Sequence, residues 1–134
     1  MDLSDFLGPE PLVVELKAED RWQAIEELIN HLVMERKLTV EHRNEVMAAV
    51  KKRETSMTTG IGLGIAIPHA STDLVSEVVA IMGRSEQGVQ FDALDRQPVK
   101  KVLLFLIPQG QFQKHMHTLA NIAKLLHRDD FRKG

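Results

Sequence analysis

One stretch of the sequence, Val102-Leu103-Leu104-Phe105-Leu106-Ile107, contains six large apolar side chains in succession. A continuous apolar run of this length is typical of a strand that is buried on both faces at the centre of a sheet. The run is far shorter than the roughly 20 apolar residues that a helix needs to cross a bilayer. The stretch therefore predicts a buried central strand in a water-soluble domain.

Shorter strands and amphipathic helices surround this run. We predict strands over residues 12–16, 65–67, 78–82 and 89–91. We predict helices over residues 20–37, 39–53 and 112–127. A glycine-rich loop is expected over residues 54–64. This order of elements indicates an α/β fold in a single domain, with a mixed central sheet sandwiched by helices.

The first predicted helix has the clearest pattern. Asp20 is a residue type that caps helix N-termini. After it, apolar side chains recur at steps of three and four residues, namely Trp22, Ile25, Leu28, Ile29, Leu32 and Val33. This spacing places them on one face of a helix. Thr39 is expected to cap the second helix in the same way.

Composition and charge exclude several classes of protein. The 134 residues suit one domain, and 17 basic against 19 acidic side chains give a net charge of −2, which argues against a nucleic-acid binder. The absence of cysteine excludes disulfide scaffolds, thiolate metal sites and cysteine nucleophiles. The acidic residues at positions 2 and 5 do not match a secretory signal. We therefore expect a cytoplasmic protein.

His69 has the most informative position among the six histidines. It follows Pro68 directly after the predicted strand at 65–67, and side chains at strand ends of α/β folds are often functional. Pro68 also restricts how the chain leaves that strand. On position alone, a functional histidine and a solvated loop histidine are both open interpretations.

The last predicted helix carries two further histidines of interest. His115 heads an apolar stripe with Leu119, Ile122 and Leu126, so it faces the core, whereas His117 falls on the polar face. His115 is therefore either a site residue or a core histidine with a satisfied hydrogen bond. Residues two apart on a helix point in nearly opposite directions, so this pair does not predict a metal site.

Two other features have ordinary structural explanations. Arg53 ends a basic cluster with Lys51 and Lys52, at the end of a predicted helix where the macrodipole favours positive charge. The glycines at alternate positions in 60–64 match neither a P-loop nor a dinucleotide fingerprint. The sequence also contains no serine-hydrolase elbow and no zinc-protease helix motif.

One longer pattern resembles the signature of a known family: Glu54, then six residues, then Ile61-Gly62-Leu63-Gly64-Ile65-Ala66-Ile67-Pro68-His69-Ala70. The family is type 2 enzyme IIA of the phosphotransferase system (PTS), with fructose, mannitol and nitrogen-regulatory members. The resemblance extends over nearly the whole chain, including residues 91–95 and 115–119. It implies that residues 1–134 form one IIA domain in which the family's usual C-terminal helix is truncated.

The resemblance implies roles for four residues. His69 matches the histidine that is phosphorylated in the family, and Arg53 matches the arginine that lies near the phosphohistidine. His115 matches a second active-site histidine, although a different alignment of the last helix would put His117 in its place. Thr59 stands where family members often carry a hydroxyl residue. The implied reaction uses no metal and no cofactor.

The resemblance also implies a function, that of a phosphotransferase component. Such a domain accepts a phosphoryl group on His69 from the phosphocarrier protein HPr and passes it to a IIB domain. IIB then phosphorylates a fructose- or mannitol-like sugar during uptake by a membrane IIC component. The alternative is the nitrogen-regulatory branch, in which the phosphorylation state is a signal to protein partners. The sequence identifies neither the branch, nor the sugar, nor the oligomeric state.

Two other classes of function agree less well with the residues. An interaction module that kept the fold but lost phosphate carriage would have lost site residues, yet His69, Arg53 and His115 are all present. A small metal-dependent hydrolase would need carboxylate and histidine ligands at a metal-binding spacing, which the sequence does not contain.

Overall fold

The described part of the structure has the predicted order, in which one strand is followed by two helices and then by several strands. The computed structural model describes residues 13–56, 60–62, 64–91, 93 and 96–111. In chain order its elements are β1 (Val13–Glu15), α2 (Arg21–Met34), the 3-10 helix η1 (Val40–His42), α3 (Arg43–Ser56), β2 (Gly60–Gly62), β3 (Ile65–Ala66), β4 (His69–Thr72), β5 (Val79–Val89) and β6 (Val99–Pro108). The helix predicted over 112–127 lies outside the described residues.

Strand β6 contains the apolar run and occupies the centre of the sheet. The strand order is β1-β5-β6-β3-β2, and β4 also pairs with β6. β5 is antiparallel to β6, whereas β3 and β4 run parallel to it. The prediction of a single α/β domain with a mixed sheet is therefore confirmed.

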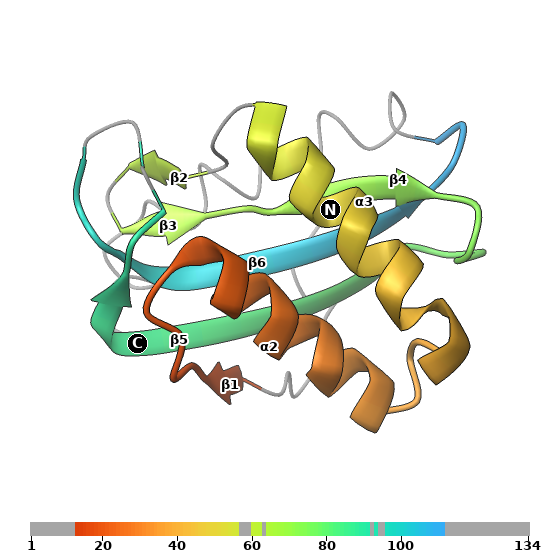
Figure 1. Cartoon of the computed structure of the whole chain (residues 1–134), viewed down its shortest axis with the longest axis horizontal. Coiled ribbons are helices and arrows are strands. Elements are labelled where there is room, and N and C mark those ends of the chain that lie inside the picture. Colours follow the sequence, from red (N-terminus) through yellow and green to blue (C-terminus); the bar gives the residue numbers. More distant parts are fainter. Residues whose placement is uncertain (1–12, 57–59, 63, 92, 94–95, 112–134) are drawn as a thin grey trace.

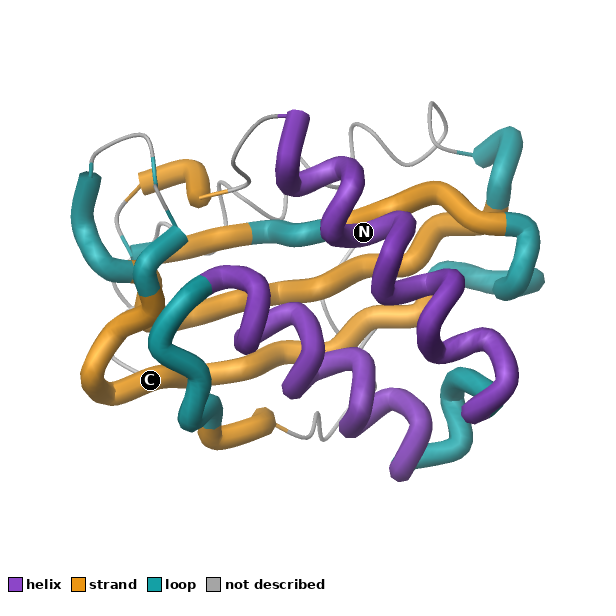
Figure 2. The backbone as a smooth tube through the Cα atoms, in the orientation of Figure 1, coloured by secondary structure: helices purple, strands orange, loops and turns teal. Residues whose placement is uncertain are grey.

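Both faces of β6 are buried, as the apolar run predicted. Val102, Leu104 and Leu106 are fully buried in the core cluster, which also contains the inward side chains of α2 and α3. The side chains that alternate with them between 103 and 107 are at most 1% exposed. Helices α2 and α3 lie side by side across one face of the sheet (Figures 1 and 2). They form one of the two predicted helical layers.

Helix α2 begins as predicted and ends earlier. The Asp20 carboxylate accepts a hydrogen bond from the Gln23 backbone N–H at 2.9 Å, which confirms its role as the N-cap. The helix ends at Met34, because Arg36 takes the left-handed conformation with φ of 60°. The expected capping by Thr39 is wrong, since Thr39 precedes the short helix η1 and its side chain makes no capping hydrogen bond.

Strand β5 replaces two predicted strands. The residues between 83 and 88 show no apolar alternation, which led to separate predictions at 78–82 and 89–91. In the structure β5 pairs with β6 from Val79 to Arg84 and again at Val89, with an irregular register between these points. Pairing to the buried central strand keeps this polar segment extended, which local pattern alone does not reveal.

The predicted loop over 54–64 contains regular structure at both ends. Helix α3 continues to Ser56, and β2 pairs antiparallel with β3. The chain also does not leave the sheet at Pro68, because it continues beside β6 as β4. Proline has no N–H to donate, but the Pro68 carbonyl accepts a hydrogen bond from the Phe105 N–H at 3.0 Å. The interpretation of His69 as a loop residue is therefore wrong.

Gly88 provides a test of the packing at the far end of β5. Its φ is +92°, and a Cβ atom added there would lie 2.6 Å from the Cβ of Pro98. We expect Gly88→Ala to lower the free energy of unfolding by about 2 to 4 kcal/mol, from backbone strain together with the clash. Urea denaturation measures this loss.

Gly110→Ala is the matched control for that variant. Gly110 has a similar φ of +89°, but an added Cβ would meet nothing within 4 Å. This control isolates the backbone strain, which we expect to lower the free energy of unfolding by about 1 kcal/mol. Equal losses in the two variants would contradict a contribution from the Pro98 contact.

Candidate active site

The backbone of His69 is fixed by the central strand. His69 is the first residue of β4, and it lies opposite Phe105 of β6 in the parallel register. The hydrogen bond from Phe105 to Pro68 ties the preceding residue to the same strand. The side chain of His69 is half-buried, so the ring has contact with solvent while its backbone belongs to the core sheet.

The imidazole of His69 has a defined tautomer. Its Nδ1 lies 2.9 Å from the carbonyl oxygen of Ile67. A carbonyl oxygen only accepts hydrogen bonds, so Nδ1 carries the proton and donates it to this contact. In the neutral ring the other nitrogen, Nε2, then has an available lone pair. The local backbone therefore makes Nε2 the nucleophilic atom.

The surroundings of His69 keep this ring neutral near pH 7. Burial lowers the pKa of His69 from its ordinary value of 6.5, and the positive charge of Arg53 lowers it further. The hydrogen bond to Ile67 and the negative charge of Glu54 raise the pKa in opposition. The lowering effects are larger, so the net pKa lies below 6.5. A neutral nucleophile is thus available at physiological pH.

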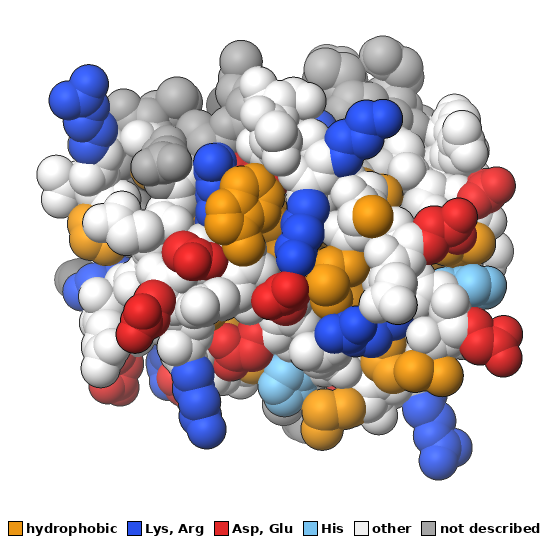
Figure 3. Space-filling view, in the orientation of Figure 1, with side chains coloured by type: hydrophobic (Ala, Val, Ile, Leu, Met, Phe, Trp, Pro, Cys, Tyr) orange, Lys and Arg blue, Asp and Glu red, His pale blue; other side chains and the backbone are white. Residues whose placement is uncertain are grey.

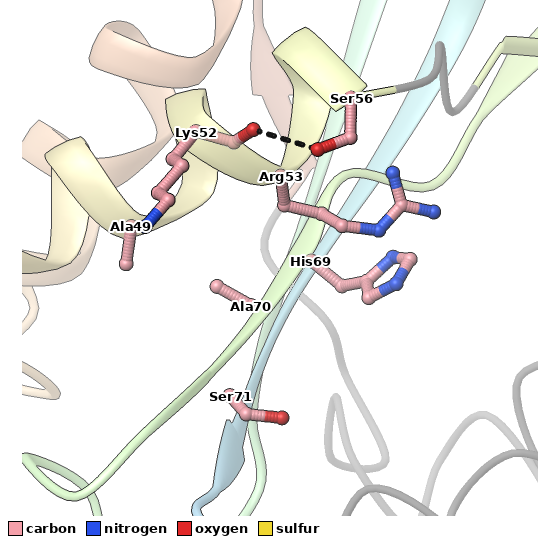
Figure 4. Close-up of a pocket in the computed structure, with 7 residues that line it drawn as sticks. All are labelled: Ala49, Lys52, Arg53, Ser56, His69, Ala70 and Ser71. Atoms are coloured by element: carbon pink, nitrogen blue, oxygen red, sulfur yellow. Dashed lines mark hydrogen bonds between the residues drawn. The ribbon is translucent and has the colours of Figure 1, made fainter.

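Arg53 lies beside His69. It belongs to the last turns of α3, which packs against β4, and its guanidinium extends to the same side as the imidazole (Figure 4). The neighbouring Lys52 turns the opposite way, towards Ala49 (Figure 4). The structure therefore selects Arg53, rather than the adjacent lysine, as the cation at the histidine ring.

These side chains surround an open pocket between α3 and β4. Its volume is about 490 Å³, and its lining consists of Ala49, Lys52, Arg53, Ser56, His69, Ala70 and Ser71. Ser71 extends to the same side of β4 as His69 (Figure 4), as expected for residues two apart on a strand. A neutral imidazole nitrogen, a guanidinium and hydroxyl groups in one pocket form a site suited to an anionic, phosphate-sized group.

The structure brings together two of the residues singled out in the sequence, His69 and Arg53. Thr59, His115 and His117 lie outside the described residues. Ser71 was missed, because the strand after Pro68 was not predicted and its period-two pattern was therefore not considered. In the view of Figure 3, Lys and Arg side chains are interspersed with Asp and Glu side chains over the face covered by α2 and α3.

Within the part of the chain that the structure describes, no cluster of three or more His, Asp or Glu side chains is arranged to hold a metal ion. Among those same residues, no helix is both long enough and apolar enough to cross a membrane.

Nearly the whole chain matches one known protein family. Residues 5–134 match the family described as the phosphoenolpyruvate-dependent sugar phosphotransferase system, EIIA 2. The chain belongs to this EIIA family. The resemblance inferred from the signature that ends at Ala70 is thereby confirmed.

Relatives of this EIIA chain come from both branches of the family. A nitrogen regulatory protein of Bradyrhizobium diazoefficiens is 32% identical over 133 residues, which cover 99% of this chain and 85% of the relative. A PTS system fructose-specific EIIA component of Haloferax volcanii is 37% identical over 94 residues, covering 70% of this chain and 61% of the relative. These relatives agree with membership in the EIIA family. Their names indicate two different roles, nitrogen regulation for the first and the fructose PTS for the second.

Solved EIIA structures have the same fold. The nitrogen regulatory protein IIA-Ntr of Neisseria meningitidis is 26% identical, with a TM-score of 0.79, over 90% of this chain and 81% of that one. The mannitol enzyme IIA of Escherichia coli, in its complex with phosphorylated enzyme IIB, is 21% identical. Its TM-score is 0.69, and the alignment covers 88% of this chain and 81% of that one.

Proposed function

We propose that this EIIA chain is a phosphoryl carrier of the phosphotransferase system, and that Nε2 of His69 holds the phosphoryl group. The observation that carries the proposal is the contact of Nδ1 with the Ile67 carbonyl, which leaves Nε2 with a lone pair in the pocket that contains Arg53. The donor is the phosphohistidine of the phosphocarrier protein HPr, and the acceptor is a IIB domain. These partners place the reaction in the cytoplasm.

In the proposed transfer, His69 is the nucleophile, Ile67 holds its ring and Arg53 is the nearby cation. The lone pair of Nε2 attacks phosphorus in line with the donor's N–P bond, that bond breaks, and its electron pair stays on the donor imidazole. The new bond puts positive charge on the His69 ring, which the Ile67 carbonyl stabilises through Nδ1–H. Arg53 stabilises the charge on the phosphoryl oxygens in a preorganised site. The onward step to IIB repeats these events with His69 as the leaving group.

His115 and Thr59 complete the proposal as further ligands of the phosphoryl oxygens. The support is the match of their positions to the family pattern. We expect His115→Ala to slow the transfer without abolishing it, because the nucleophile at His69 remains. Quench-flow transfer from phosphorylated HPr measures this rate. Unchanged transfer in His115→Ala with slow transfer in His117→Ala would assign the role to His117 instead.

Delivery to a IIB domain for uptake of a fructose-like sugar is the first form of this function that we propose. The fructose-specific relative supports it. The alternative is nitrogen regulation, in which the phosphorylation state controls protein partners, and the nitrogen regulatory relative supports that form over 99% of this chain. A transfer assay with a purified fructose IIB domain separates the two, since only the first form predicts rapid loss of the phosphoryl group to IIB.

The decisive experiment for carriage is intact mass spectrometry. We expect the purified protein, incubated with phosphoenolpyruvate, enzyme I and HPr, to gain one acid-labile phosphoryl group. Omission of HPr is the control, because the proposal requires a phosphohistidine donor. A folded protein that gains no phosphoryl group from HPr, or from the homologous carrier of the nitrogen branch, would contradict the proposed function.

The lowered pKa of His69 predicts the pH dependence of phosphorylation. The rate follows the neutral ring, so it should fall as the pH drops through a value below 6.5 and be level near pH 7. The measurement is the rate of phosphorylation by phosphoramidate between pH 5 and 8, with N-acetylhistidine as a parallel acceptor. The ratio of the two rates cancels the ionisation of the donor, and it should rise as the pH drops because the free imidazole is protonated first. A midpoint above that of N-acetylhistidine would contradict the assigned environment of His69.

A further inference from the structure

A buried carboxylate that the proposed mechanism does not use lies next to the pocket. Glu54 follows Arg53 in α3, and its side chain is completely buried. One carboxylate oxygen, Oε2, lies 3.3 Å from Nη1 of Arg21, the first residue of α2. Burial of an ionised carboxylate is unfavourable unless a partner of opposite charge is held against it. The ion pair therefore fixes the end of α3 relative to the start of α2.

Arg21 is itself held in place by two other contacts. Its backbone N–H donates to the Gln90 carbonyl oxygen at 2.9 Å, which ties the start of α2 to the end of β5. Its guanidinium carbon lies 4.4 Å from the centre of the Trp22 ring, a cation–π geometry. Only 19% of its side chain is exposed. Arg21 is thus a preorganised partner for Glu54 rather than a mobile surface cation.

The ion pair is close to the reacting histidine. Glu54 and Arg53 are adjacent in the same turn of α3, and Arg53 extends beside the His69 ring (Figure 4). The charge of Glu54 also acts on His69, whose pKa it raises. A shift of this helical turn would therefore have two effects. It would move the Arg53 guanidinium away from the His69 ring, and it would change the electric field that Arg53 and Glu54 exert on that ring.

We propose that Glu54, held by Arg21, is a positioning residue that keeps Arg53 beside His69 for phosphoryl transfer. We assign it no part in the bond changes; it acts through the turn of α3 that carries Arg53. The inference rests on the proposed function of His69 as the phosphoryl acceptor, and it extends the site to a residue at the start of α2. The two partners are 33 positions apart in the sequence.

A second ion pair between the same helices provides a matched control. Lys51 of α3 and Glu26 of α2 lie 2.8 Å apart, with 33% and 44% of their side chains exposed. This pair joins the two helices as the first pair does, but it is partly exposed, and neither of its charges is among the causes of the shifted pKa of His69. If the role of Glu54 were only to join the helices, loss of either pair would have similar consequences for the reaction.

The test measures phosphorylation of His69 by phosphoramidate in the full chain. In this reaction the donor P–N bond breaks, ammonia leaves and the Nε2–P bond forms, so no protein partner is needed. We expect Glu54→Gln and Arg21→Gln each to slow this reaction about tenfold or more, as misplacement of a catalytic group does. Arg21→Lys should remain within about threefold of the wild-type rate, and Lys51→Gln should be unchanged.

A second readout distinguishes positioning from general stability. Because Arg53 lowers the pKa of His69, its displacement from the ring should raise that pKa. We therefore expect Arg21→Gln, which keeps the Glu54 charge, to raise the pKa of His69 in an NMR titration of the ring nitrogens, whereas Lys51→Gln should leave it unchanged. The double variant Arg21→Gln/Glu54→Gln should be no slower than the slower single variant, as expected for residues that act as a unit. Circular dichroism confirms that each variant is folded.

Three outcomes would overturn the proposal. They are a wild-type rate in folded Glu54→Gln, equal slowing by Lys51→Gln, and no difference between Arg21→Lys and Arg21→Gln. The last comparison applies even where Glu54→Gln does not fold. Failure of the proposed function has a different signature, because the wild type would then react with phosphoramidate and accept nothing from HPr or its nitrogen-branch homologue.

Discussion

His69→Ala takes up no phosphoryl group, whereas the wild-type chain gains one under the same conditions; this is the largest effect that we expect. The substitution removes Nε2, the only atom to which we assign the new bond. It also removes the hydrogen bond from Nδ1 to Ile67. The backbone pairing of β4 with β6 does not depend on the side chain, so the fold should be retained.

His42→Ala is the control for this experiment. His42 lies in η1, before the start of α3, whereas Arg53 and the pocket lie near the end of that helix. It should accept one phosphoryl group, as the wild type does. Intact mass before and after mild acid treatment measures the labile group. An acid-labile phosphoryl group at the wild-type level in folded His69→Ala would overturn the assignment of the acceptor.

Arg53→Gln should show the second largest effect, a fall in the rate of phosphoryl acceptance of about 100-fold or more. Loss of one preorganised donor to developing oxyanion charge has an effect of this size in other enzymes. The variant retains the nucleophile, so the reaction should be slow rather than absent. Single-turnover kinetics with phosphorylated HPr gives the rate.

The same substitution should also change the titration of His69. Arg53 lowers the pKa of His69, so its removal should raise that pKa and move the midpoint of the pH–rate profile upwards. Lys52→Gln is the control, because Lys52 lines the same pocket but turns away from the ring (Figure 4). Equal effects of the two substitutions would show that the pocket needs only general positive charge.

The sequence was sufficient for the central features of the molecule. The apolar run at 102–107 predicted the buried strand β6, and the periodicity after Asp20 predicted α2 with its cap. The pattern from Glu54 to Ala70 predicted the family. The family resemblance also singled out His69 and Arg53, which the structure places in one pocket. For the strand and the helix, the spacing of apolar residues in the sequence matches the set of side chains that is buried in the fold.

The remaining features depend on contacts between distant parts of the chain. Strand β4 and the polar part of β5 are extended because β6 pairs with them, and their own residues have no strong strand pattern. The ion pair of Arg21 with Glu54 requires the crossing of α2 and α3 to be known. The tautomer of His69 depends on the direction of the Ile67 carbonyl, which a sequence does not specify.

The attachment of Pro68 to β6 has a consequence for the proposed phosphoryl transfer. The Phe105 amide that donates to Pro68 lies in the most buried strand, so it should exchange with deuterium only on global unfolding. The backbone next to His69 should therefore open only when the whole domain unfolds. In the proposed transfer, the backbone of the acceptor strand therefore stays in place, and selection among partners falls to the shape and charge of the surface around the ring.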